Sequence, residues 1–73
     1  MVQRMSPVPP YRQVYEIIRG QIQSGELPPG SVVPSLAALV QTYEINRSTA
    51  HKVHRALVAD GLVETGPMGT FVI

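Results

Sequence analysis

The stretch INRSTAHKVHRALVADGL, from Ile45 to Leu62, decides the fold of this chain. Asn46 can accept backbone N–H bonds as a helix N-cap, and Gly61 can adopt the left-handed conformation that ends a helix. The residues between them are predicted to form about four turns at about 3.6 residues per turn. Apolar side chains fall on one stripe of this helix and polar or basic ones on the other side, the first being Ala50, Val53 and Leu57 and the second Ser48, His51, Lys52 and Arg55.

The polar side of this helix carries a local positive charge. Residues 45–59 contain three of the six Lys and Arg of the chain and no acid. The acids all lie outside this stretch and are Glu16, Glu26, Glu44, Asp60 and Glu64. A net charge of only +1 therefore hides an uneven distribution, and the helix is predicted to press into a polyanion such as phosphate.

Two further amphipathic helices are predicted ahead of this stretch. The first begins at Pro10, an acceptable first helical residue, and ends at Gly25. Its apolar positions recur at three- and four-residue spacing and are Tyr11, Val14, Ile17, Ile18 and Ile22. Ser35 is a natural N-cap for the second helix, which ends near Glu44. Because only a few residues separate it from the basic helix, the pair is predicted to form a helix-turn-helix unit.

Beyond Gly61 the pattern changes to short β-prone runs. Residues 62–65 and 70–73 bracket two glycines and a proline at 66–69, which predicts a β-hairpin. Residues 31–33 predict a very short strand at best.

The predicted fold class is mainly α with a small β-hairpin. Residues 10–73 are expected to form a winged helix-turn-helix domain of three helices plus the wing. Residues 1–9, with Pro7 and Pro9, are expected to form an extended or disordered arm.

Composition narrows the class of protein. A chain of 73 residues with 44% hydrophobic residues allows one domain with a modest aliphatic core and little room for a deep ligand pocket. The absence of cysteine excludes a disulfide framework and a thiolate metal site. No signal peptide is recognisable, and no run approaches the roughly 20 apolar residues that span a bilayer. We therefore expect a cytoplasmic domain without membrane contact. Since no nucleophile–base pair or paired carboxylates are recognisable either, we also expect it to be non-enzymatic and without a cofactor.

Several motifs of the chain also resemble a known family. They are YRQV at 11–14, GELPPG at 25–30, VPS at 33–35, NRST at 46–49, DGLV at 60–63 and GTFV at 69–72. In this order and nearly this spacing they are similar to the GntR-type winged-helix DNA-binding domain over residues 11–73. The resemblance is to the DNA-reading half alone, without the C-terminal effector-binding and dimerising half that such regulators usually carry.

The resemblance implies a sequence-specific transcriptional regulator that binds double-stranded DNA, of repressor type. The third helix would enter the major groove and the wing would reach the minor groove. The expected operator is an inverted repeat bound by a homodimer. The alternative is a winged-helix protein–protein interaction module with weak or no specific DNA binding, which flat salt dependence would reveal.

The resemblance assigns DNA contacts to four residues, Arg47, Ser48, Thr49 and Gly69. Three departures from the family remove positive charge. Ala37 and His51 stand where arginine is usual, and the hairpin is about one residue short, with Thr65, Pro67 and Met68 in place of basic residues. Weaker and less salt-sensitive binding than in a typical member is therefore expected.

The basic residues have a direct chemical rationale. At the start of the third helix the guanidinium of Arg47 could bond O6 and N7 of guanine in a bidentate fork. The competing interpretation is a surface arginine or an ion pair with Glu44. Lys52 and Arg55 are predicted phosphate anchors, against the alternative of an ordinary charged face.

The hydroxyl residues could contact phosphate, but they also suit a helix start. Ser48 and Thr49 can donate hydroxyls to phosphate, and Thr49 lies toward the buried side. Ser35 could bind phosphate as well as cap its helix. Gly69 is most simply a turn residue, and its minor-groove approach rests on the resemblance.

The two histidines raise the question of a metal site. His51 and His54 lie at adjacent helical positions, but no third ligand stands close in sequence, whereas Zn²⁺ takes about three or four protein ligands. We therefore expect no metal. His51 is predicted to point outward and contact a base or phosphate, and His54 to be half-buried with its hydrogen bonding satisfied.

Overall fold

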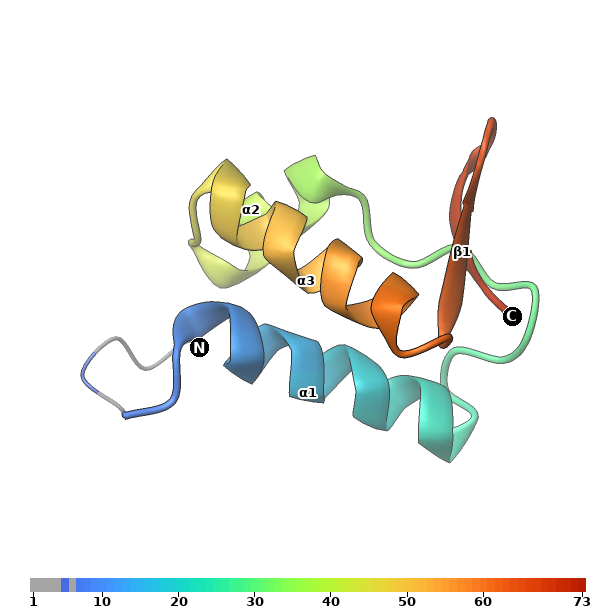
Figure 1. Cartoon of the computed structure of the whole chain (residues 1–73), viewed down its shortest axis with the longest axis horizontal. Helices are drawn as coiled ribbons and strands as arrows, with labels where there is room; N and C mark the ends of the chain where they lie inside the picture. The colour runs from blue at the N-terminus through green and yellow to red at the C-terminus, as the bar shows by residue number, and fades with distance from the viewer. Residues whose placement is uncertain (1–4, 6) are drawn as a thin grey trace.

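The computed structural model of the chain describes residues 5 and 7–73. Its elements follow the order α1 (Pro10–Ser24), α2 (Leu36–Tyr43), α3 (Arg47–Ala59), β1 (Val63–Gly66) and β2 (Gly69–Val72). In Figure 1, α1 runs beneath α3, α2 lies on the other side of α3, and the hairpin stands beside the C-terminal end of α3. The predicted winged helix-turn-helix is confirmed. Most of the predicted arm, residues 1–4 and 6, lies outside the described residues.

The helices begin and end where their local signals predict. Pro10 opens α1, and Gly25 closes it in the left-handed conformation with φ of 87°. The Ser35 hydroxyl caps α2 by accepting the N–H of Ala38 at 3.1 Å. Local chemistry thus fixes the ends of both helices.

The C-terminal end of α3 is a Schellman motif. The N–H of Gly61 donates to the carbonyl of Val58 and the N–H of Leu62 to that of Leu57, each at 3.0 Å. Gly61 has φ of 72°, the left-handed conformation that glycine adopts without strain. The chain therefore leaves the helix sharply and turns directly into β1.

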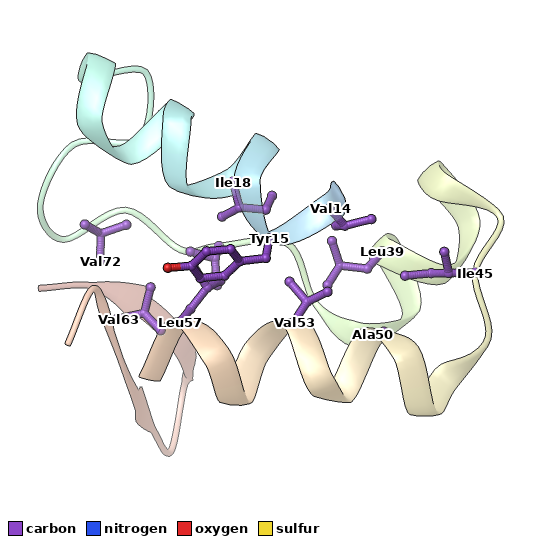
Figure 2. Close-up of a cluster of buried hydrophobic side chains, with 11 residues drawn as sticks. Val14, Tyr15, Ile18, Leu39, Ile45, Ala50, Val53, Leu57, Val63 and Val72 are labelled. Atoms are coloured by element: carbon purple, nitrogen blue, oxygen red, sulfur yellow. The ribbon is translucent and has the colours of Figure 1, made fainter. Parts of the chain in front are cut away.

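The core lies between α1 and α3 and is closed by α2 at one end and by the wing at the other (Figure 2). Its buried members are Val14, Tyr15, Ile18, Val33, Leu39, Ile45, Ala50, Val53, Leu57, Val63 and Val72. The predicted buried stripe of α3 is confirmed in full.

One predicted core position of α1 is wrong. Ile17 is 43% exposed, whereas Tyr15 is 4% exposed. At about 100° per residue, the apolar positions Val14, Ile18 and Ile22 span an arc of about 80°; Tyr15 lies about 20° beyond one end of this arc, whereas Ile17 lies about 60° beyond the other end. Helical phase, rather than hydrophobicity, selects the buried residue.

The wing is a two-stranded antiparallel hairpin that is extended by part of the α1–α2 connection. Gly66 pairs with Gly69, so Pro67 and Met68 alone form the turn, and the predicted strand residues Leu62 and Ile73 lie outside the strands. Two bonds of 2.8 Å join the segment 30–31 to Val72, and the Val33 N–H donates to the Thr70 carbonyl at 2.9 Å. The short strand predicted at 31–33 is reduced to an isolated bridge between Val32 and Phe71.

No helix in the described part of the chain combines the length and the hydropathy needed to cross a bilayer.

Candidate nucleic-acid interface

Three basic or imidazole side chains form a stripe along α3. Arg47, His51 and Arg55 follow one another at intervals of four residues and are all exposed. Residues i and i+4 of a helix lie on the same face, so the three side chains stand in line. Within residues 5 and 7–73 no ion pair joins Arg47 to Glu44, and none of the three has a hydrogen-bond partner. The stripe is therefore available to an external ligand.

The first turn of α3 is organised by Asn46. Its side-chain oxygen accepts the N–H of Thr49 at 2.8 Å and the hydroxyl of Ser48 at 2.9 Å. The predicted cap is confirmed, and it holds the backbone that carries Arg47. It also engages the Ser48 hydroxyl proton, so a phosphate contact from Ser48 requires that hydroxyl to rotate away. Thr49 is half-buried, as its mixed role predicts.

Lys52 and Arg55 lie three residues apart on the exposed face of α3 but have different neighbours. The Lys52 ammonium lies 5.9 Å from the ring centroid of Tyr11 on α1, a cation–π distance. Arg55, by contrast, faces the wing side. Lys52 therefore lies beside the stripe, toward α1, whereas Arg55 is a stripe residue that also lines the space next to the wing.

His54 is half-buried, and its hydrogen bonding is satisfied. Its Nε2 lies 2.8 Å from the carbonyl oxygen of Pro34. Because a carbonyl only accepts, this ring nitrogen carries the proton and donates it. The bond ties α3 to the segment that leads into α2. Across the described residues, no three His, Cys, Asp or Glu side chains gather where they could share a metal ion.

A groove separates α3 from the wing. We call it the α3–wing groove; its volume is about 950 Å³, and it is lined by residues of the 32–36 segment, of α3 and of the hairpin. The lining residues are Val32, Val33, Ser35, Leu36, His51, His54, Arg55, Val58, Ala59, Thr65, Met68, Gly69 and Thr70. None of them is acidic.

The predicted site residues divide between two neighbouring places. Ser35, His51, Arg55 and Gly69 line the α3–wing groove. A second group, Arg47, Ser48, Thr49 and Lys52, lies on the N-terminal half of α3 outside the groove lining. The two groups share the helix, and together they cover its length from the first turn to the wing.

Gly69 stands at the rim of the groove with φ of 125°. That conformation strains any residue with a Cβ, although space for a Cβ is open there. The backbone of the hairpin tip, rather than a side chain, is therefore what Gly69 offers to a ligand.

Sequence reasoning missed the aliphatic part of the groove. Val32 and Val58 are exposed and line it. The signals were present: Val58 follows buried Leu57 and so falls off the apolar stripe, and Val32 precedes buried Val33 on an extended segment.

Comparison with known proteins places these features in a family. The model of the bacterial regulatory proteins of the gntR family matches residues 10–73. The HTH-type transcriptional regulator YdfD of Bacillus subtilis is 42% identical over 71 residues, which are 96% of this chain and 15% of that protein. The histidine utilization repressor of Pseudomonas aeruginosa is 43% identical over 67 residues, 90% of this chain and 27% of that protein. This chain thus spans a small part of the length of these relatives.

A solved structure extends the similarity to three dimensions. The DNA-binding domain of AraR in complex with operator ORX1 superimposes with a TM-score of 0.89 at 32% identity, covering 100% of this chain and 95% of that chain. With a family model matched over residues 10–73, this chain belongs to the GntR family of bacterial regulatory proteins.

Proposed function

We propose that residues 10–73 bind a specific double-stranded DNA sequence as the DNA-reading part of a transcriptional repressor. The observation that carries the proposal is the acid-free stripe of Arg47, His51 and Arg55 on α3 beside the wing. Its support from relatives is the AraR domain of the same fold, which is solved on operator DNA. Relatives named as repressors, such as NagR of Bacillus subtilis at 35% identity over 72 residues, support the direction of regulation.

In the proposed complex α3 enters the major groove by its N-terminal half. Arg47 reads guanine through a bidentate fork, and His51, one turn further, contacts a base or phosphate. Lys52, Arg55 and Ser48 contact phosphates and fix the register without reading sequence.

The remaining predicted contacts come from the helix ends and the wing. Gly69 brings the backbone of the hairpin tip to the minor groove. A hydroxyl both donates and accepts, so Ser35 can cap α2 and also donate to phosphate. Thr49 combines a structural role with a phosphate contact.

Two copies of the chain on an inverted repeat complete the proposal. A two-fold protein assembly matches half-sites that lie about 10–10.5 base pairs apart, or multiples of this spacing. Selection of bound sites from a random duplex library tests this directly, since a palindromic consensus is expected. A cytoplasmic location belongs to the same proposal, because bacterial operators lie there.

Replacement of Arg47 by alanine tests whether this residue reads a base. Loss of a bidentate contact with guanine is expected to weaken binding to the selected duplex by about 1–3 kcal/mol and to relax specificity at one base pair. Gel-shift titration against a panel of single-base variants measures both. Arg19→Ala on α1, which removes a surface arginine paired with Glu16, is the matched control. Unchanged affinity and base preference in Arg47→Ala would remove Arg47 from the readout.

The protein-interaction alternative makes the opposite prediction. A module that binds a protein through α3 has no phosphates to neutralise, so random and selected duplexes would show equally weak, salt-independent association. No observation on the described residues favours this alternative over DNA.

A further inference from the structure

The α3–wing groove has an aliphatic lining that the contacts proposed so far do not use. Val32, Val58 and Met68 line it and are 67%, 44% and 92% exposed. Three exposed aliphatic side chains around one concavity mark a contact surface. The same lining contains Arg55 and His51 and no acid, so the occupant must be compatible with positive charge.

The position of the groove indicates which part of a duplex would occupy it. In the proposed complex α3 lies in the major groove and the wing at the neighbouring minor groove. A sugar–phosphate strand separates these two grooves of any duplex. That strand must therefore pass between α3 and the wing, where the α3–wing groove lies.

We propose that the α3–wing groove seats this sugar–phosphate strand. Val32, Val58 and Met68 contact the apolar faces of deoxyribose, and Arg55 contacts a phosphate. The inference rests on the proposed function and adds an uncharged, sequence-independent part to it. A strand that alternates apolar sugars with anionic phosphates matches a lining that combines aliphatic side chains with cationic ones.

The walls of the groove are fixed before any ligand arrives. Hydrogen bonds of 2.8–2.9 Å tie residues 30–33 to β2, and His54 ties Pro34 to α3. On the wing, the hydroxyls of Thr65 and Thr70 lie 3.5 Å apart among the lining residues; because Thr70 is buried and Thr65 exposed, the Thr65 hydroxyl is the one that can donate to phosphate. A preorganised wall loses little conformational entropy on binding, which suits an interface with few charges.

A charge placed in the groove tests the occupant. Val58→Lys adds a cation inside the groove, and Ile17→Lys adds one on α1, outside it, at a nearly identical exposure of 43% against 44%. With a random-sequence duplex, Val58→Lys is expected to bind about two- to fivefold more tightly than the unsubstituted chain. Its slope of log K against log salt should steepen by about 0.9, one phosphate contact, while Ile17→Lys leaves the slope unchanged.

An uncharged variant isolates the sugar contact. Met68→Ala is expected to weaken binding about two- to fivefold with an unchanged salt slope, because it removes apolar area and no charge. Met68 is 92% exposed, so its truncation leaves the fold intact, and urea titration of each variant verifies this.

These experiments distinguish failure of the groove assignment from failure of the proposed function. Equal effects of Val58→Lys and Ile17→Lys, or a Met68→Ala variant that binds as the unsubstituted chain does, would overturn the groove assignment. Loss of specific binding in Arg47→Ala would then still leave the proposed function standing. If the unsubstituted chain bound no duplex at any salt concentration, as expected for a groove that takes a peptide, both proposals would fail.

Discussion

At the residue scale, Tyr15 places a phenol in an otherwise aliphatic core. Its hydroxyl donates a hydrogen bond to the carboxylate of Asp60, the C-cap of α3. The pKa of Tyr15 is raised above 10.0, first because its hydroxyl donates to that carboxylate and then because the ring is buried. The bond joins α1 to the end of the helix that carries the interface.

Replacement of Tyr15 by phenylalanine tests this bond. The variant keeps the ring and loses the hydrogen bond, so the free energy of unfolding should fall by about 1 kcal/mol. For a domain of this size the melting temperature should then fall by about 4–8 °C. Tyr43→Phe is the matched control, since the Tyr43 hydroxyl has no hydrogen-bond partner among residues 5 and 7–73. Equal melting temperatures for the two variants would show that the bond contributes nothing.

The same bond predicts a dependence of stability on pH. The folded-state pKa of Tyr15 is raised above 10.0, so the unfolded chain loses this proton first as pH rises. The stabilisation is therefore fully present below about pH 10 and is lost as pH rises through the folded pKa. Urea titrations at increasing pH should show the difference between the unsubstituted chain and Tyr15→Phe shrinking in alkali. A difference that stays constant well above that pH would contradict the assignment.

At the scale of elements, the helix caps were predictable because they are local. Ser35, Asn46 and Gly25 act within a few residues of themselves, so neighbouring sequence suffices to place them. The stripe of Arg47, His51 and Arg55 was predictable for the same reason, since regular spacing fixes a helical face.

Contacts between distant segments were not predictable in this way. The α3–wing groove combines residues 32–36 with α3 and the hairpin, which only the tertiary fold brings together. The partial strand at 31–33 depends on its bonds to β2, and the hydroxyl of the buried Tyr15 has its partner at Asp60, far along the chain. The hydrophobicity of the side chains gave no reason to prefer Tyr15 over Ile17, although the helical phase did.

Substitutions at the N-cap of α3 can change DNA affinity while they leave the stability of the fold unchanged. Asn, Asp and Ser cap helices about equally well, and an anion at the N-terminus is favoured by the helix dipole. Asn46→Asp should therefore fold at least as stably as the unsubstituted chain. Beside Arg47 and an approaching phosphate, however, the added charge should weaken duplex binding, and the loss should shrink as salt rises.

The neutral cap Asn46→Ser provides the matched control for this experiment. It should retain both stability and affinity, because it keeps the cap and adds no charge. Thermal melting and gel-shift titration at two salt concentrations measure the two quantities separately. If Asn46→Asp bound DNA as tightly as Asn46→Ser at low salt, the N-terminus of α3 would not face phosphate.

At the scale of the whole molecule, charge is scarce and concentrated. The net charge is +1, and the wing supplies no basic side chain between Val63 and Val72. The proposed interface must therefore draw its electrostatic attraction from α3, where Lys52 lies toward α1 and Arg55 toward the wing. The remainder of its affinity would come from uncharged contacts.

Because the cationic residues are few, the salt dependence of binding can be used to count the phosphate contacts. Two phosphate anchors per chain predict a slope of log K against log salt of about −1.8 for one chain, and about −3.6 for two chains on an inverted repeat. Lys52→Gln and Arg55→Gln should each reduce the slope by about 0.9 per chain. Arg19→Gln, whose arginine pairs with Glu16 on α1, should leave it unchanged.

The chain can be titrated with one half-site and with the full repeat over a range of salt concentrations. The two slopes together give the number of phosphate contacts per chain and the number of chains bound. A slope that doubles on the repeat indicates two equivalent chains, because each adds the same anchors and releases the same counterions. An equal slope on both duplexes would mean that one chain binds the operator. A slope that all three substitutions reduce alike would mean that the attraction comes from net charge, and then neither Lys52 nor Arg55 would be an anchor.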